Sequence, residues 1–195
     1  RVEGDRIVAG TYGAAAVAAG GEVLLRGICP SDLKVPLEEF QKAGAAVDAD
    51  EKNRQIRICM GKRPLPLLIK TEPYPGFPTD LQSPFMAFLA TAQGTSYIEE
   101  QVFEGRFATA KILEQMGAVI RTEDQRAVIE GHYPLKGAAV NACDLRGGAA
   151  LMVAALTAEG DTFIGECHHI ERGYEDICRD MAALGAHICW VEKDS

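Results

Sequence analysis

Hydrophobic and polar positions along the chain follow one pattern three times. In each copy a largely apolar stretch of helical length leads into a short strand, and an amphipathic helix follows. The apolar stretches occupy residues 11–19, 83–92 and 146–158. Because self-similarity at a fixed period indicates a repeated structural unit, we expect three copies of one α/β unit.

Glycines mark two fixed points in every copy, one after the apolar stretch and one after the amphipathic helix. An Asp stands 15, 14 and 16 residues before the first glycine, and the two glycines are 24, 23 and 25 residues apart. These glycines are Gly20, Gly94 and Gly160, then Gly44, Gly117 and Gly185. Glycine at such positions suits a left-handed helix C-cap, and three matching spacings make chance a poor explanation.

Strands are predicted after each second glycine, with a further strand in the first two copies and short strands in the links. Their ranges are 45–49, 118–122 and 186–191, then 55–59 and 126–130, then 67–70 and 138–141. The units therefore span approximately 5–60, 79–130 and 144–195. They are expected to share one core, so that residues 1–195 form a single α/β domain with pseudo-threefold character.

The third unit ends without an obvious final strand, which predicts that a partner strand comes from elsewhere in a longer product. The charged start of the chain, Arg1-Val2-Glu3-Gly4-Asp5, has no initiator Met and no signal-peptide hydrophobic region, which also indicates a piece of a longer product. An unpaired sheet edge invites pairing with another chain, so we expect this chain on its own to self-associate through that edge.

Composition narrows the classes of function. The chain has 195 residues and is 47% hydrophobic, enough for one domain with a sizeable core. No apolar run approaches 18 residues, so no membrane span is expected. The net charge is −8 and no basic cluster is longer than Lys62-Arg63, which argues against nucleic acid as a partner.

Six scattered cysteines include no C-x-x-C pair, which favours a reducing, cytoplasmic location over a disulfide framework. The run Cys167-His168-His169 resembles a metal-binding cluster. Adjacent residues on a strand point to opposite faces, however, so we expect no metal site there.

The most distinctive stretch is the segment 73–82, with three prolines and a glycine within six residues. Such a segment predicts a stiff, extended loop, because Pro fixes φ and lacks an N–H. The loop ends in Thr79-Asp80, two good helix-capping residues, just before an apolar helical run. Asp80 either only caps this helix or is a carboxylate delivered for chemistry. The rigid lead-in, which capping does not require, favours the second interpretation.

Several motifs together resemble the UDP-N-acetylglucosamine 1-carboxyvinyltransferase family of enolpyruvyl transferases. They are Phe77-Pro78-Thr79-Asp80-Leu81-Gln82, Val102-Phe103-Glu104-Gly105-Arg106-Phe107, Met116-Gly117-Ala118, Asp144-Leu145-Arg146 and His169-Ile170-Glu171-Arg172-Gly173-Tyr174-Glu175. The resemblance covers essentially the whole chain. It implies an inside-out α/β barrel domain of three repeated units, equivalent to the C-terminal half of a two-domain protein. The domain with the family's reactive cysteine loop is absent from this chain.

The resemblance implies transfer of the enolpyruvyl group of phosphoenolpyruvate to the 3′-hydroxyl of UDP-N-acetylglucosamine, with release of phosphate. This is the first committed step of peptidoglycan synthesis, and it needs no cofactor. By resemblance, Asp80 lies beside the sugar hydroxyl as ligand and candidate base, and Val102 contacts the nucleotide sugar through its backbone. Arg172 holds phosphoenolpyruvate, since an Arg fork suits carboxylate or phosphate. The implied partner is the N-terminal half of the same protein, without which the chain should be inactive.

Three further residues are candidates for the cleft. Asp144 and Arg146 fall in the family pattern, although Asp144 heads the third repeat and would serve equally as a cap. Arg106 either binds an anion or pairs with Glu104 or Glu175.

Two other functions remain open. One is a nucleotide-sugar-binding paralogue without catalysis, against which the presence of both Asp80 and Arg172 counts. The other is the related shikimate-pathway enolpyruvyl transferase, which is not expected to share the motifs around Asp80 and Val102.

Overall fold

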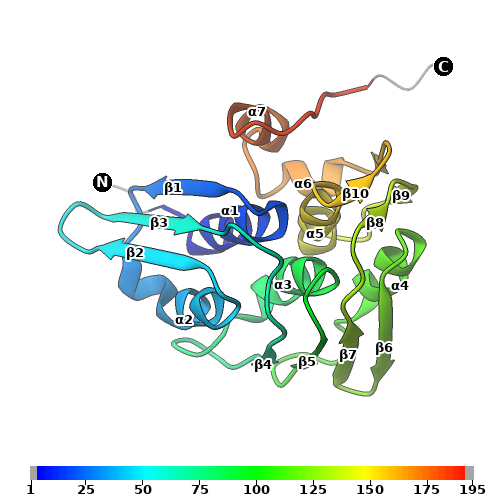
Figure 1. The fold of residues 1–195 in the computed structure, drawn as a ribbon, viewed down its shortest axis with the longest axis horizontal. Helices are drawn as coiled ribbons and strands as arrows, with labels where there is room; N and C mark the ends of the chain where they lie inside the picture. The colour runs from blue at the N-terminus through cyan, green and yellow to red at the C-terminus, as the bar shows by residue number, and fades with distance from the viewer. Residues whose placement is uncertain (1–3, 192–195) are drawn as a thin grey trace.

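The computed structural model describes residues 4–191, and these form a mixed α/β fold (Figure 1). The helices are α1 (Arg6–Ala19), α2 (Lys34–Lys42), α3 (Gln82–Leu89), α4 (Ala108–Gln115), α5 (Leu145–Ala155), α6 (His168–Glu171) and α7 (Ile177–Ala183), with 3-10 turns η1 (Pro30–Leu33) and η2 (Thr79–Leu81). The strands are β1 (Glu22–Arg26), β2 (Ala46–Asp50), β3 (Gln55–Cys59), β4 (Leu68–Lys70), β5 (Thr95–Glu99), β6 (Val119–Glu123), β7 (Arg126–Glu130), β8 (Leu135–Lys136), β9 (Ala139–Asn141), β10 (Ala158–Glu159) and β11 (Phe163–Gly165).

Three apolar helices, α1, α3 and α5, pack against one another in the middle of the fold, and the sheets lie outside them (Figure 1). All eight residues of α3 are buried, which explains why its sequence shows no polar face. The rings of Phe40 and Phe85 stack with centroids 4.7 Å apart, and Phe88 lies 4.9 Å from Phe85. One hydrophobic core therefore joins α2 of the first unit to α3 of the second.

The first two units have the same sheet. In the first unit, β3 lies between β1 and β2 and pairs antiparallel with both. In the second unit, β7 lies between β5 and β6 in the same way. The registers also match, because Cys59 opposes Glu22 and Ala46 just as Glu130 opposes Thr95 and Val119. Strands β3 and β7 have the predicted bounds, and β4 adds a parallel edge to the second sheet.

The six glycines at the two fixed points of the repeat have the backbone conformation that the sequence pattern predicts. All six have positive φ, from 66° at Gly20 to 134° at Gly94. A side chain is disfavoured in this backbone region, which gives a physical reason for glycine at both fixed points of every copy.

The third unit differs from the other two. Its strands form two short parallel pairs, β8 with β10 and β9 with β11. The predicted strand at 186–191 is wrong, since these residues are irregular. A strand needs a ladder partner for its backbone groups, and the described residues supply no counterpart of β3 or β7 here. The predicted unit extends to residue 195, and its last four residues lie outside the described range.

The proline-rich segment is a compact turn and not the extended loop that the sequence predicts. Thr71 bridges Phe77, and the Gly76 N–H donates to the carbonyl of Pro73 at 2.9 Å. Because this bridge is parallel, the chain makes a loop over residues 71–77 and leaves it in the direction in which it entered. Pro78 then leads into η2 in an extended conformation.

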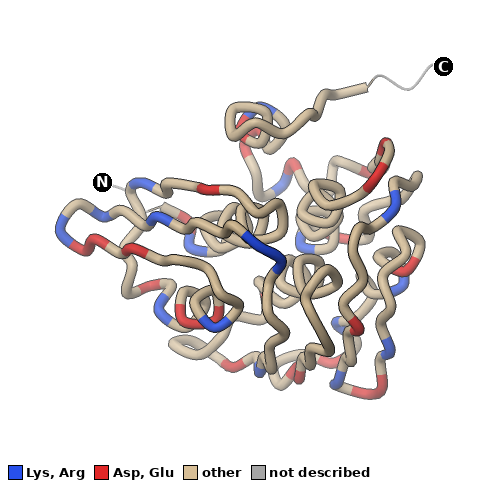
Figure 2. Tube along the Cα trace, viewed as in Figure 1, with Lys and Arg blue, Asp and Glu red and all other residues tan. Residues whose placement is uncertain are grey.

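Lys and Arg residues are interspersed with Asp and Glu residues along the trace in Figure 2. Within the described residues, no helix has the length and apolar character needed to cross a membrane.

Candidate active site at the start of the central helices

The three Asp residues that head the repeats do not have the same role. Asp5 accepts hydrogen bonds from the backbone N–H groups of Ile7 and Val8, at 2.7 and 3.1 Å. Asp144 likewise accepts from the Gly147 N–H at 2.7 Å. Both are helix N-caps, so the capping interpretation of Asp144 is confirmed.

Asp80 caps no helix. The N-cap positions of η2 and α3 are Pro78 and Leu81, and neither turn has a side-chain cap. The Asp80 carboxylate is held instead by two guanidinium groups, with Oδ1 2.5 Å from Arg106 and Oδ2 3.1 Å from Arg146. The capping interpretation is therefore wrong at this one position of the three.

These three side chains are partly accessible to solvent. The exposed fractions are 38% for Asp80, 29% for Arg106 and 18% for Arg146. The cluster can thus meet a ligand, while both positive charges are screened less than on an open surface. Two cations around one carboxylate leave a net positive charge, which suits an anionic ligand.

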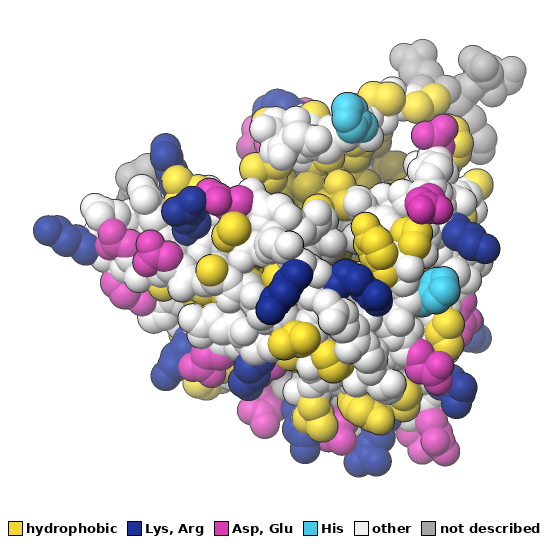
Figure 3. Space-filling model, viewed as in Figure 1, with side chains coloured by type: hydrophobic (Ala, Val, Ile, Leu, Met, Phe, Trp, Pro, Cys, Tyr) yellow, Lys and Arg dark blue, Asp and Glu magenta, His cyan; other side chains and the backbone are white. Residues whose placement is uncertain are grey.

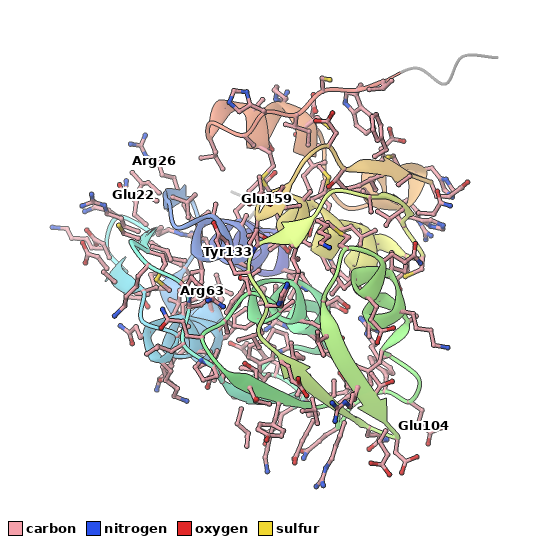
Figure 4. All side chains as sticks on the ribbon, turned by 45° about the vertical axis from the view of Figure 1, so that its right-hand side comes forward. Glu22, Arg26, Arg63, Glu104, Tyr133 and Glu159 are labelled. Atoms are coloured by element: carbon pink, nitrogen blue, oxygen red, sulfur yellow. The ribbon has the colours of Figure 1, made fainter. Side chains whose placement is uncertain are left out.

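Arg106 does not pair with Glu104 or Glu175, which were the alternatives to an anion-binding role. Its carboxylate partner is Asp80, and its guanidinium also lies 5.2 Å from the ring of Phe103. Glu104 projects outward at the lower edge of the molecule (Figure 4). The separate cation–π contact of Arg63 with Tyr133, also labelled in Figure 4, spans 5.4 Å.

Tyr174 connects the Asp80 cluster to the first unit. Its hydroxyl lies 2.9 Å from the Thr11 hydroxyl of α1, and the positive charge of Arg146 acts on its pKa. Burial raises the pKa of Tyr174, and the contacts with Thr11 and Arg146 oppose that rise. Tyr174 therefore lies between Thr11 of α1 and the start of α5, which carries Arg146 of the Asp80 cluster.

Glu100 lies beneath the loops that carry the predicted site residues. It is 1% exposed, and its Oε1 accepts from the N–H groups of Val102 and Phe103 at 2.9 and 3.1 Å. Its Oε2 accepts from the Thr79 hydroxyl at 2.9 Å. Sequence reasoning did not select this residue. The signal was present, because alternation along β5 puts Glu100 on the buried face with Ser96 and Ile98.

Arg172 is not joined to this cluster. It follows α6, is exposed, and has no side-chain ion pair or hydrogen bond among the described residues. Helix α6 packs on α5, the helix that carries Arg146. The Arg172 side chain is therefore available to a ligand.

Cys167, His168 and His169 stand at the start of α6 and not on a strand. Across residues 4–191, no group of three or more His, Cys, Asp or Glu side chains is placed to hold a metal ion. The cysteines of this range carry no disulfide.

Two cavities of the described residues lie away from Asp80, around α7. One, of about 440 Å³, lies between α1, α5 and α7, and the recess below α7 in Figure 3 has hydrophobic side chains. The other, of about 640 Å³, lies between β9, β11, α6, α7 and the residues 188–191. Both adjoin the part of the third unit that has no sheet partner.

A family model described as EPSP synthase (3-phosphoshikimate 1-carboxyvinyltransferase) matches residues 1–181. Curated relatives named UDP-N-acetylglucosamine 1-carboxyvinyltransferase match nearly the whole chain. The protein of Desulfofundulus thermocisternus is 47% identical over 94% of this chain and 75% of its own length. Those of Carboxydothermus hydrogenoformans and Legionella pneumophila are 47% and 46% identical, and the chain spans only 44% and 37% of their lengths.

Among solved structures, the enolpyruvyl transferase NikO from Streptomyces tendae superposes with a TM-score of 0.83 at 28% identity. The match covers 94% of this chain and 43% of NikO. EPSP synthase from Acinetobacter baumannii superposes with a TM-score of 0.66 at 21% identity, over 84% of this chain, and shows the fold alone.

Proposed function

The chain belongs to the EPSP synthase family, and from that premise we propose that it is part of an enolpyruvyl transferase acting on UDP-N-acetylglucosamine. The reaction moves the enolpyruvyl group of phosphoenolpyruvate to the 3′-hydroxyl of the sugar and releases phosphate. The names of the relatives at 42–47% identity favour this acceptor over 3-phosphoshikimate.

The observation that carries the proposal is the departure of Asp80 from the capping role of Asp5 and Asp144. A carboxylate held by Arg106 and Arg146 is fixed in position while remaining 38% exposed. In our proposal the sugar 3′-hydroxyl hydrogen-bonds Asp80, which takes its proton as the hydroxyl oxygen attacks C2 of phosphoenolpyruvate. An acid from the rest of the product protonates C3, and loss of a C3 proton then breaks the C2–O bond and releases phosphate. Arg106 and Arg146 then stabilise the negative charge of the bound phosphoenolpyruvate and the leaving phosphate.

Val102 contributes through its backbone in this proposal. Its N–H already donates to Glu100, so the contact with the nucleotide sugar falls to its carbonyl oxygen. Arg172, which is exposed and has no side-chain partner within the described range, binds the phosphoenolpyruvate carboxylate or phosphate. Neither role requires a metal or an organic cofactor.

The N-terminal half of the same product is the proposed partner of this domain. In the second unit, β7 lies between β5 and β6, whereas β11 has no antiparallel neighbour among the described residues. A strand from the rest of the product, placed between β11 and residues 186–191, would complete the third sheet. It would also complete an inside-out α/β barrel of three repeated units.

The test is phosphate release from phosphoenolpyruvate, measured on the full product of the gene. We expect release with UDP-N-acetylglucosamine and none with shikimate 3-phosphate. The reverse preference would assign the chain to the other acceptor. Binding of the nucleotide sugar without phosphate release would make it a binding module, which is the second candidate function.

The same assay on residues 1–195 alone should show no release, because half of the proposed cleft is missing. Light scattering over a concentration series tests whether this isolated chain pairs through the open edge at β11. A monomeric mass at every concentration would contradict self-association.

A further inference from the structure

The segment between β5 and α4, which contains Val102 and Phe103, is attached to the Asp80 loop by the buried side chain of Glu100, in addition to the ion pair between Arg106 and Asp80. Glu100 accepts from both backbone N–H groups of this segment through Oε1, and from the Thr79 hydroxyl through Oε2. Thr79 is the immediate neighbour of Asp80. The carboxylate of Glu100 is therefore the buried connection between the two segments, although they are more than 20 residues apart in the chain.

A second contact supports the same junction. The Gln101 N–H donates to the hydroxyl of buried Thr71 at 2.8 Å, and the Thr71 N–H donates to the Glu99 carbonyl at 2.9 Å. Thr71 begins the turn that leads to Asp80, so its contacts fix where that turn starts. The contacts of Glu100 fix where it ends.

We propose that Glu100 is a positioning residue for the nucleotide-sugar site, setting the distance between the Val102 backbone and the Asp80 carboxylate. The inference rests on the proposed function. Glu100 itself does not touch the substrate, since it is 1% exposed and the hydrogen bonds of its side chain are to the two loops. Its effect passes through Thr79 on one side and through the Val102 and Phe103 amides on the other.

Substitutions at Glu100 separate its hydrogen bonds from its charge. In Glu100→Gln the amide oxygen accepts from Val102 and Phe103, and the amide NH₂ donates to Thr79, so all three bonds have a replacement. In Glu100→Ala the two N–H groups and the hydroxyl lose their buried partner, which loosens both loops.

The kinetic experiment uses the full product, varying each substrate in turn. For Glu100→Ala we expect a rise of about tenfold or more in KM for UDP-N-acetylglucosamine. We expect a fall in kcat approaching 10²-fold, since misplacement by about 1 Å has effects of that size. KM for phosphoenolpyruvate should rise less than KM for the nucleotide sugar, because Arg146 on α5 and Arg172 after α6 lie outside both loops. Glu100→Gln should restore both parameters to within about threefold of the wild type.

Glu99 provides the matched control. It is the adjacent glutamate, and its carboxylate pairs with Lys70 and Arg126 at 3.2 and 3.3 Å, away from both loops. Glu99→Ala should leave both KM values unchanged. If Glu100 only stabilised the fold, Glu100→Ala would reduce the fraction of folded enzyme. The apparent kcat would then fall, and neither KM would change. That result, or a Glu100→Gln protein as impaired as Glu100→Ala, would overturn the proposal.

Amide hydrogen exchange on the same full product gives a second result that does not depend on activity. Glu100→Ala should speed exchange at Val102 and Phe103, while Glu100→Gln and Glu99→Ala should not. If the wild-type product transfers no enolpyruvyl group, the proposed function fails. Exchange then decides the positioning claim separately, and unchanged protection in Glu100→Ala overturns it.

Discussion

The carboxylate of Asp80 lies 3.1 Å from the guanidinium of Arg146, a residue 66 positions later in the chain. The contact joins the start of α3 in the second unit to the start of α5 in the third. The equivalent Asp residues of the first and third units are bonded to their own helix instead. One copy of a repeated capping position has thus been converted into a charged cluster between units.

This difference predicts that an Asp-to-Asn substitution lowers activity at Asp80 but not at the equivalent Asp5. Asp80→Asn keeps the shape of the side chain and an acceptor for one arginine, but it removes the proposed base. In the full product, phosphate release should fall by about 10²–10⁴-fold, the usual contribution of a general base. Asp5→Asn should leave release unchanged, because Asn is an equally good cap. Equal losses in the two variants would contradict a special role for Asp80.

Because Asp5 and Asp144 cap helices, their substitution should lower stability. Asp5→Ala leaves the Ile7 and Val8 N–H groups without their acceptor, and Asp144→Ala does the same at Gly147. Each should lower the free energy of unfolding by about 0.5–2 kcal/mol, measured by urea denaturation. Asp5→Asn is the control, with a loss of only a few tenths of a kcal/mol. An Asp5→Ala protein as stable as the wild type would show that this cap adds nothing.

Gly131 is a position where the backbone of another element leaves no room for a side chain. A Cβ there would lie 1.9 Å from the carbonyl oxygen of Ala92, and a backbone atom cannot move aside as a flexible side chain can. Gly131→Ala should therefore lower the free energy of unfolding by about 1–3 kcal/mol or more. The matched change Gly61→Ala has open space around the added Cβ and should be within about 0.5 kcal/mol of the wild type. Urea denaturation of both variants provides the comparison.

The thiol of Cys178 predicts a pH dependence. Burial, with a smaller contribution from Asp176, raises the pKa of Cys178 from its ordinary value of 9.0 to about 11. Between these two values the unfolded chain releases a proton that the folded chain retains, so the free energy of unfolding falls as pH rises. Below pH 9 the thiol is protonated in both states and has no such effect.

The measurement is urea denaturation of the wild type and Cys178→Ala at pH 8 and pH 10.5. Tyr174 also has a raised pKa, so both proteins should lose stability at the higher pH. The loss should be smaller in Cys178→Ala. An identical loss in the two proteins would show that Cys178 does not contribute.

The repeat and its glycines were predictable because they depend on local conformation. Positive φ at Gly20 or Gly44 is a requirement of the residue itself, and it appears wherever the pattern recurs. Strands β3 and β7 were likewise recognisable from alternation over five residues. The strand expected at 186–191 was not, because a strand exists only with a partner, and the described residues offer none.

The sequence by itself determined the repeated pattern, the central apolar helices and the choice of Asp80 as a candidate, because the repeat spacing, the turn residues and the motifs all depend on residues close together in the chain. Only the tertiary structure decided what Asp80 does. Capping was equally available to Asp5, Asp80 and Asp144 at the level of sequence. The arginines that take Asp80 away from its helix come from 26 and 66 residues further along the chain. The role of Glu100 depended on folding for the same reason. Alternation along β5 indicates its buried face, but its bond to Thr79 exists only once β5 lies beneath the Asp80 loop.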